Sequence, residues 1–353
     1  KYLSEELQIS IPKTRRVSKN FIQITGAREN NLKNINVRFP LDSLTVITGV
    51  SGSGKSTLVK KILYPLMQKK IIGYGEKIGH HSEMNGSFDH IKHVEFIDQN
   101  PIGRSSRSNP VTYIKAYDDI RSLLSSQKIS KIRNYKPKHF SFNVDGGRCE
   151  TCKGEGVVTI EMQFMADVHL QCDDCSGKRF KKEVLEVNFE GKNIDDILNS
   201  TIDDAVSFFN SYNQLKIANK LKPLQDVGLG YVKLGQSSST LSGGEAQRIK
   251  LASFLVKGNT KDKALFIFDE PTTGLHFHDI KKLLASFNAL INKGHSIIVI
   301  EHNIELIKCA DYIIDLGSEG GKKGGKLLFE GTPEKLIKNN ISYTATYLKE
   351  KLT

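Results

Sequence analysis

A glycine-rich loop near the start of this 353-residue chain has the residue types needed to hold a polyphosphate. The loop consists of Gly49, Val50, Ser51, Gly52, Ser53, Gly54, Lys55, Ser56 and Thr57. Its glycines let backbone N–H groups approach phosphate oxygens, and a helix starting here would direct its positive end toward them. We expect Lys55 to reach the β- and γ-phosphates and Ser56 to place its hydroxyl on Mg²⁺. The pattern therefore predicts a site for ATP and magnesium.

A pair of carboxylates further along the chain could complete the chemistry of hydrolysis. Asp269 and Glu270 directly follow the apolar run 264–268. In phosphoryl transfer, one such carboxylate binds Mg²⁺ and its neighbour stands beside the attacking water. We therefore predict that Asp269 is a magnesium ligand and that Glu270 is the general base. Taken alone, a strand ending in an acidic turn would explain the pair equally well, and the phosphate-binding loop is what favours catalysis.

Four of the five cysteines have the spacing of a zinc site. The two Cys-x2-Cys pairs consist of Cys149, Cys152, Cys172 and Cys175. The nineteen residues 153–171 separate them, and four thiolates complete a tetrahedral Zn²⁺ site without an open position. Between the pairs, Ile160 and Met162 alternate with polar residues, as in a β-hairpin. We predict a structural metal centre that closes the base of a hairpin, with disulfides or free thiols as the less favoured alternative.

Basic residues outnumber acidic ones, with 51 Lys and Arg against 39 Asp and Glu and a formal net charge of +12. This excess favours a polyanionic partner, nucleic acid before an anionic membrane. A basic cluster beside the last cysteine pair is expected to contact DNA phosphates, and it consists of Lys178, Arg179, Lys181 and Lys182. A solvated surface without a partner remains the alternative.

The sequence contains no apolar run of about 18 residues, so we expect no membrane-spanning segment and no membrane partner. The residues from Lys1 to Glu6 lack the apolar region of a signal peptide, and the fifth cysteine, Cys309, stands alone, so we expect a protein of the reducing cytoplasm. It also lacks an initiator methionine, so we expect a fragment or a processed chain.

The elements that must position these groups alternate between strands and helices. Periodicity predicts strands at 21–24, 35–39, 44–48, 264–268 and 296–300, and helices at 56–67, 110–133 and 194–224. The last two strands are apolar throughout, as in a parallel sheet that is covered on both faces. The stretch 73–93 is expected to be loop-rich, with surface histidines at His80, His81, His90 and His93. A mobile loop between two late strands is indicated by Gly317, Gly320, Gly321, Gly324 and Gly325.

Further motifs resemble the ABC ATPase superfamily. The octapeptide 241–248 matches its signature sequence, in which Ser242, Gly243 and Gly244 would cap the γ-phosphate of a nucleotide held by a partner cassette. Gln99 occupies the place of the glutamine that senses magnesium and water in this superfamily.

Two later segments extend the resemblance. His302 stands where the superfamily has its γ-phosphate switch histidine, and the segment 272–276 corresponds to its subunit-contact loop. Transport cassettes usually stack adenine on an aromatic ring in the first strand region, and residues 24–28 contain none. The base contact is therefore expected from another group, such as the guanidinium of Arg28.

A zinc hairpin inserted between the glutamine and the signature sequence is not a feature of transport cassettes. Together with the motifs at 26–33, 103–110, 140–143, 147–150 and 234–236, it makes the chain resemble the UvrA family over residues 20–353. These are the damage-recognition ATPases of bacterial nucleotide excision repair, and the resemblance is to their second half. It implies an α/β fold, an ABC-type P-loop NTPase core with a helical signature subdomain and an inserted zinc-bound β-hairpin module.

The expected domain boundaries follow from this resemblance. They are a basic linker at 1–20, the ATPase core at 21–110 and 241–353, the helical signature subdomain at 111–148 and 183–240, and the zinc-binding hairpin module at 149–182.

The resemblance also implies a function, ATP-dependent recognition of damaged double-stranded DNA and its transfer to UvrB, within the DNA-damage (SOS) response. ATP, Mg²⁺ and Zn²⁺ are the implied cofactors, and DNA incision belongs to another subunit. In this superfamily a nucleotide lies between one cassette's phosphate loop and another's signature, so Lys55 and Ser242 would serve different sites. The chain would then need a first half, which normally carries the UvrB-binding region, or a second copy of itself.

Three other functions remain open. The first is the nucleotide-binding subunit of a membrane transporter, which the zinc insertion does not favour. The second is a half that binds DNA but hydrolyses little ATP. The third is a related two-cassette protein that serves drug resistance instead of repair.

Overall fold

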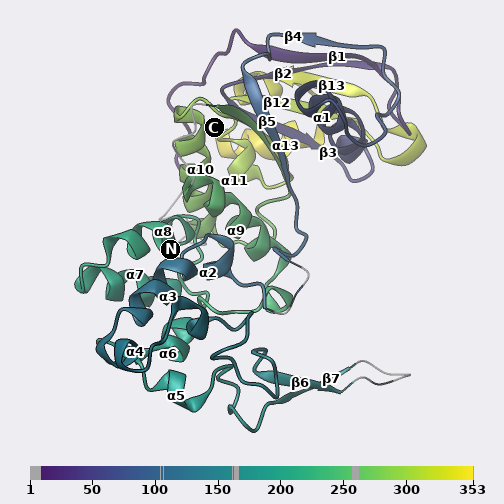
Figure 1. Cartoon of the computed structure of the whole chain (residues 1–353). Coiled ribbons are helices and arrows are strands. Elements are labelled where there is room, and N and C mark those ends of the chain that lie inside the picture. The colour runs from purple at the N-terminus through teal and green to yellow at the C-terminus, as the bar shows by residue number, and fades with distance from the viewer. Residues whose placement is uncertain are drawn as a thin grey trace. The chain divides into compact units, whose positions relative to one another are not determined.

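The computed structural model describes residues 9–103, 105, 107–160, 162, 167–256 and 262–352. Contacts between residues divide the chain into two compact units, one formed by residues 1–98 and 258–353 and the other by residues 99–257. Figure 1 shows the larger sheet in the first unit and many short helices in the second. The middle of the sequence is therefore an insertion between the two parts of one sheet-containing unit.

The first unit is built on a six-stranded sheet with the order β13-β12-β3-β11-β10-β5. Its strands are β3 (Leu44–Gly49), β5 (Ile91–Ile97), β10 (Lys263–Asp269), β11 (Ser296–Ile300), β12 (Tyr312–Leu316) and β13 (Leu327–Gly331). The strands from β12 to β5 pair in parallel, whereas β13 pairs antiparallel with β12. Every residue of β11 is buried, which explains why its sequence is apolar without alternation.

A smaller antiparallel sheet in the same unit has the order β2-β1-β4. It consists of β1 (Phe21–Ala27), β2 (Ile35–Pro40) and β4 (Glu83–Gly86). The helical segments are the π-helical turn Thr57–Leu63, α1 (Tyr64–Ile72), α10 (Phe277–Asn292), α11 (Ile304–Ile307), the 3-10 turn Gly321–Lys323, α12 (Pro333–Leu336) and α13 (Tyr343–Leu352). Ile24, Ile47, Leu58 and Ile298 belong to one buried cluster, which joins both sheets to the turn after the glycine-rich loop.

The second unit is mainly helical. It contains α2 (Pro110–Tyr113), α3 (Tyr117–Ser125), α4 (Lys128–Ile132), the 3-10 turn Pro137–Phe140, α5 (Lys182–Leu185), α6 (Ile194–Asn199), α7 (Ile202–Ser211), α8 (Leu215–Asp226), the 3-10 turn Ser238–Thr240 and α9 (Gly243–Val256). Its two hairpins are β6 (Val157–Ile160) with β7 (Val168–Gln171), and β8 (Asn188–Phe189) with β9 (Lys192–Asn193). Phe140 and Phe142 are fully buried, and the hydroxyl of Tyr117 donates a 2.7 Å hydrogen bond to the carbonyl of Phe140.

The predicted strands and helices are confirmed, and the stretch predicted to be loop-rich at 73–93 also holds two strand segments that were not predicted. It contains β4 and the first residues of β5. Because β5 is an edge strand of the six-stranded sheet, Lys92 and His93 are exposed and the strand lacks a continuous apolar run.

The segment predicted as a basic linker is attached to the first unit over its described part, residues 9–20. Ile9 is buried, and the guanidinium of Arg16 forms a 3.0 Å ion pair with the carboxylate of Asp311. Arg15 pairs in the same way with Glu334 at 2.7 Å. Two of the basic side chains that suggested a linker therefore hold the segment in place.

The units also divide at positions that differ from the expected 110 and 241. The divisions fall after residues 98 and 257, so α9 belongs to the helical unit. The reason is that α9 packs against α8 and α2. Over the described ranges, every helix is too short or too polar to cross a membrane.

Candidate nucleotide site and metal centre

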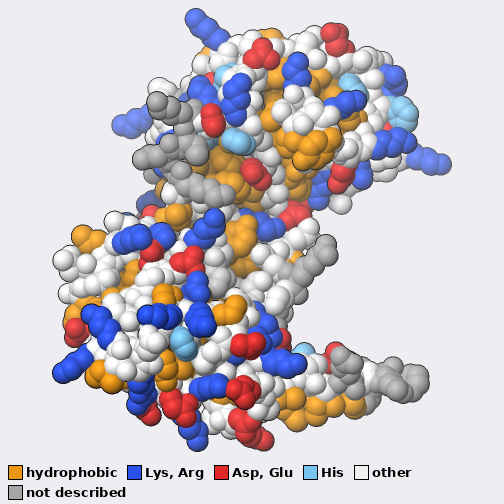
Figure 2. Space-filling model, in the orientation of Figure 1, with side chains coloured by type: hydrophobic (Ala, Val, Ile, Leu, Met, Phe, Trp, Pro, Cys, Tyr) orange, Lys and Arg blue, Asp and Glu red, His pale blue; other side chains and the backbone are white. Residues whose placement is uncertain are grey.

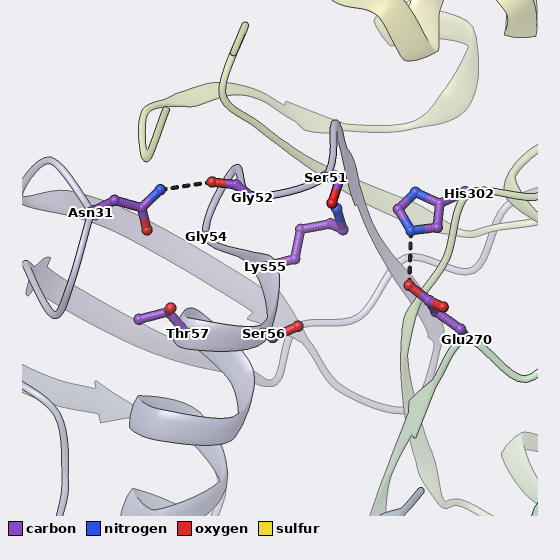
Figure 3. Close-up of a pocket in the computed structure, with 9 residues that line it drawn as sticks. All are labelled: Asn31, Ser51, Gly52, Gly54, Lys55, Ser56, Thr57, Glu270 and His302. Atoms are coloured by element: carbon purple, nitrogen blue, oxygen red, sulfur yellow. Dashed lines mark hydrogen bonds and ion pairs between the residues drawn. The ribbon is translucent and has the colours of Figure 1, made fainter. Parts of the chain in front are cut away.

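The phosphate-binding loop begins where β3 ends and leads into the turn Thr57–Leu63 (Figure 3). Gly49, Gly52 and Gly54 have φ angles of 128°, 73° and 103°, which glycine adopts without strain. A Cβ atom on Gly49 would lie 2.2 Å from the carbonyl oxygen of Leu316 in the neighbouring β12. The close passage of the loop along β12 therefore requires glycine at this position.

Lys55 is buried inside the loop. Its ammonium group donates hydrogen bonds to the carbonyl oxygens of Gly49 (2.8 Å) and Val50 (2.9 Å). Burial lowers the pKa of Lys55, and nearby carboxylates, led by that of Glu270, oppose this effect. A partly desolvated ammonium group is stabilised by an anion. This environment suits the predicted contact with phosphate oxygens.

Nine residues line a pocket at this loop (Figure 3): Asn31, Ser51, Gly52, Gly54, Lys55, Ser56, Thr57, Glu270 and His302. Glu270 follows β10 and His302 follows β11, and these strands are parallel neighbours, so both side chains emerge at the same edge of the sheet. The His302 Nε2 atom lies 2.9 Å from the Glu270 Oε1 atom. The pocket thus collects a phosphate-binding loop, a carboxylate and an imidazole.

The backbone of Glu270 is itself unusual. Its φ of 48° is in the left-handed region, which residues with a side chain rarely adopt and which occurs preferentially at functional sites. Its N–H donates a 2.9 Å hydrogen bond to the carbonyl of Ile300. Asp269, the predicted magnesium ligand, forms a 2.7 Å ion pair with Lys60 and is not among the residues that line the described pocket.

Asn31 is a pocket residue that the sequence reasoning did not select. Its amide Nδ2 donates to the carbonyl oxygens of Gly52 (2.8 Å) and Gly321 (3.0 Å). Asn31 therefore joins the phosphate-binding loop to the glycine-rich segment 317–325. One indication was present in the sequence, because Asn31 lies within the motif 26–33. That motif does not predict which residues Asn31 contacts.

The segment 317–325 connects β12 to β13, as predicted, and its backbone is hydrogen-bonded to the phosphate-binding loop. The N–H groups of Gly321 and Gly325 donate to the carbonyls of Gly52 (3.0 Å) and Ser53 (3.1 Å). A Cβ atom on Gly320 would lie 2.5 Å from the carbonyl oxygen of Ser51. The glycines therefore permit backbone-to-backbone contact with the phosphate-binding loop.

The signature residues and Gln99 belong to the helical unit. Ser242 precedes α9, its hydroxyl accepts a 3.2 Å hydrogen bond from the N–H of Glu245, and its own N–H donates to the Glu245 carboxylate at 2.8 Å. This capping box directs the start of the helix, with Gly243 and Gly244, toward an anion. A Cβ atom on Gly243 would lie 2.9 Å from the Gln99 Cβ atom, so these two predicted site residues are in contact.

The four cysteines of the predicted zinc site come together. Their sulfur atoms are buried and all lie within 4.8 Å of one another, at 3.9 Å for Cys149 and Cys172 and 3.6 Å for Cys152 and Cys175. A tetrahedral Zn²⁺ ion with bonds of about 2.3 Å separates its sulfur ligands by about 3.8 Å, whereas a disulfide needs about 2.05 Å. The donor set therefore fits zinc. Burial raises the pKa of Cys175 to about 12, an effect that a bound Zn²⁺ ion would offset.

Known proteins that resemble this chain in sequence and structure agree with this geometry. The chain is 55% identical over 352 residues to the UvrABC system protein A of Clostridium acetobutylicum, which covers 99% of this chain and 37% of that protein. The protein of the same name from Bacillus subtilis is 52% identical over 349 residues, covering 99% of this chain and 36% of its own length. The crystal structure of UvrA2 from Deinococcus radiodurans matches 99% of this chain and 42% of its own with a TM-score of 0.90 and 40% identity.

The chain belongs to the UvrA family. It spans little more than a third of the length of the curated relatives named above. No family model matches the sequence. The predicted fold class is confirmed, an α/β core of the ABC ATPase type with a helical insertion that carries a four-cysteine cluster able to bind zinc.

In this member of the UvrA family, the hairpin above the cysteine cluster has one apolar face. The antiparallel register pairs Val158 with Leu170 and Ile160 with Val168, so the four side chains share a face. Their exposed fractions range from 39% to 51%, and Figure 2 shows hydrophobic side chains along the hairpin. An exposed apolar face of this kind is typical of an interaction site.

The basic cluster beside the hairpin divides into two pairs. Lys178 and Lys182 are exposed. Lys181 forms a 2.5 Å ion pair with Glu150, and the guanidinium of Arg179 lies over the ring of Phe142, 5.8 Å from its centroid. Of the four predicted DNA contacts, Lys178 and Lys182 are therefore the most accessible side chains.

The possible stacking of adenine on the guanidinium of Arg28 stays a prediction. Its guanidinium donates to the carbonyl of Gly26 (3.1 Å) and to the hydroxyl of Ser82 (3.0 Å). These bonds hold β1 against the segment before β4.

Proposed function

We propose that this chain is an ATP-hydrolysing, DNA-binding half of a nucleotide excision repair ATPase. The observation that carries the proposal is the pocket in which Lys55, Glu270 and His302 meet, in a chain that is 55% identical to a UvrABC system protein A. Each group has a role in phosphoryl transfer that suits its position. The proposed product is ADP and phosphate.

The proposed roles follow from the chemistry of each side chain. Lys55 and the loop N–H groups bind phosphates. Ser56 and Asp269 would hold Mg²⁺ together, once the ion pair between Asp269 and Lys60 opens. Glu270 accepts the proton of the attacking water, and His302 holds Glu270 and contacts the γ-phosphate. Gln99 is proposed to sense magnesium and water.

The signature residues Ser242, Gly243 and Gly244 are proposed to act on a nucleotide bound by a second cassette. That cassette is either another segment of a longer protein or a second copy of this chain. Closure of two cassettes on ATP would then change the grip on double-stranded DNA, and damaged DNA would be passed to UvrB. The excess of basic residues and the exposed hairpin support a DNA partner.

The dependence of ATPase rate on protein concentration tests this proposal. We expect the rate per chain to rise with concentration and then level off, because each site needs a signature from another molecule. A rate per chain that stays constant in a demonstrably monomeric sample would contradict it.

A complementation experiment sharpens the test. Lys55→Ala and Ser242→Ala should each abolish most turnover, whereas an equimolar mixture should recover about a quarter of it. The reason is that about half of the random dimers are mixed, and each mixed dimer contains one site with both native residues. No recovery on mixing would show that Lys55 and Ser242 serve the same site.

A further inference from the structure

Glu301 is a buried carboxylate that lies outside the nucleotide pocket and has no role in the proposed chemistry. It stands between the last residue of β11 and His302, and only 2% of it is exposed. A desolvated carboxylate is costly unless it is well hydrogen-bonded. The hydrogen-bond partners of Glu301 therefore indicate its role.

The two oxygens of Glu301 serve two different segments. Oε2 accepts hydrogen bonds from the N–H groups of His302 (2.6 Å) and Asn303 (2.9 Å). Oε1 accepts from the N–H of Thr272 at 2.9 Å and also from the Thr272 hydroxyl. One oxygen thus holds the segment that carries His302, and the other holds the segment that follows Glu270.

This division uses the full capacity of an ionised carboxylate, which accepts hydrogen bonds and donates none. Hydrogen bonds to a charged acceptor are stronger than neutral ones and fix their donors closely. The same two segments are also joined across the pocket by the 2.9 Å contact between His302 and Glu270. Glu301 therefore closes a loop of contacts that links the two segments.

We propose that Glu301 is a positioning residue that couples the segment 272–276 to His302. A partner cassette pressing on that segment would displace Thr272, and the shared carboxylate would carry the displacement to the imidazole that holds Glu270. This inference rests on the proposed function, in which two cassettes pair, and on the expectation that 272–276 is the subunit-contact loop. It adds the physical connection between cassette pairing and the catalytic groups.

The variant Glu301→Gln removes the shared hydrogen bonding between the two segments with little change in side-chain volume. A glutamine has one acceptor oxygen, so it can accept hydrogen bonds from only one of the two segments. Its NH₂ group would face the N–H donors of the other segment and could not accept from them. We expect kcat to fall about tenfold, as for loss of charge-assisted hydrogen bonds. Binding of a non-hydrolysable ATP analogue should change less than about twofold, since the phosphate-binding loop is untouched.

A spectroscopic readout distinguishes coupling from a purely structural role. In full-length chain with isotope-labelled histidine, the His302 imidazole signals are assigned with His302→Gln and followed by NMR. Thr272→Val, which removes only the hydroxyl donor, should shift these signals in the parent and not in the E301Q background. Thr273→Val, a matched change at the exposed neighbouring threonine, should leave them unchanged.

Each outcome decides a separate question. Equal shifts from Thr272→Val in both backgrounds would overturn the coupling through Glu301, even if ATP turnover depends on concentration as proposed. Should E301Q fail to fold, Thr272→Val in the parent still decides, because an unshifted His302 signal would contradict the coupling. If the unsubstituted chain shows no ATPase activity, the proposed function is contradicted, but the NMR result still decides the coupling through Glu301.

Discussion

At the scale of single residues, Glu270 combines a left-handed backbone with a hydrogen bond to His302, so its carboxylate is fixed at the pocket edge. The variant Glu270→Gln keeps the size of this side chain and its contact with His302, but it cannot accept a proton from water. We expect ATP binding within about twofold of the parent and a loss of turnover of roughly 10²–10⁴-fold.

Single-turnover hydrolysis and equilibrium nucleotide binding measure these two effects. The exposed Glu350 of α13 provides a matched control, because Glu350→Gln should change neither quantity. Turnover near the parent rate in Glu270→Gln would remove Glu270 from the role of general base.

Residue types and spacing were sufficient to find the groups whose chemistry is local. The glycine-rich loop, the two carboxylates and the four cysteines could be predicted because each follows a fixed spacing along the chain. Asn31 could not, since its partners lie 21 and 290 residues away. The role of Glu301 was hidden for the same reason, because Thr272 is 29 residues away and becomes its neighbour only when β10 and β11 pair.

At the scale of elements, we expect a metal ion held by the four cysteines to supply most of the stability of the β6–β7 hairpin. Such a short two-stranded hairpin is marginal in water, and its apolar face is exposed rather than packed. We expect Cys172→Ser to lower bound zinc from about one ion per chain to near zero, because the site loses one of four thiolates. Amide hydrogen exchange should accelerate over 157–160 and 168–171.

Metal analysis and exchange mass spectrometry check this expectation. Cys309→Ser is the matched control, since Cys309 is a buried cysteine in the other unit and is outside the four-cysteine cluster. Full zinc content in Cys172→Ser would mean that the cysteine cluster does not hold the ion in the way its geometry suggests.

Element prediction succeeded where burial along a strand is uniform or alternates regularly, as in β11, β1 and β2, and it missed the strand whose burial is irregular. The strand β11 was predictable because both of its faces are covered, whereas β5 at the sheet edge mixes exposed polar residues with buried apolar ones. The contacts of the segment 317–325 could not be predicted, because a glycine-rich sequence suits both a flexible loop and close backbone packing. Only the three-dimensional neighbours decide, as at Gly325, where a Cβ atom would lie 1.9 Å from the carbonyl oxygen of Asn31.

At the scale of the whole molecule, the net charge of +12 has meaning for binding only once the surfaces that carry it are known. Charge alone predicts attraction to a polyanion but not where it binds. The hairpin module supplies the most specific surface, since an apolar face and the exposed Lys178 and Lys182 occur in one module. Lys181 contributes less to the outward field, because Glu150 neutralises it.

This division of the basic cluster makes a prediction about DNA affinity. If Lys178 and Lys182 each neutralise one phosphate, the joint change to alanine should reduce the slope of log K against log salt by about 1.8, because each contact releases about 0.9 counterion. Affinity should fall similarly for any DNA sequence, since phosphate contacts carry no base information. Fluorescence anisotropy with one duplex at several salt concentrations measures the slope, and Lys181→Ala is the matched control expected to change it by less than about 0.5. An unchanged slope in the double variant would move the phosphate contacts to another part of the surface and leave the hairpin with its apolar face alone to meet DNA.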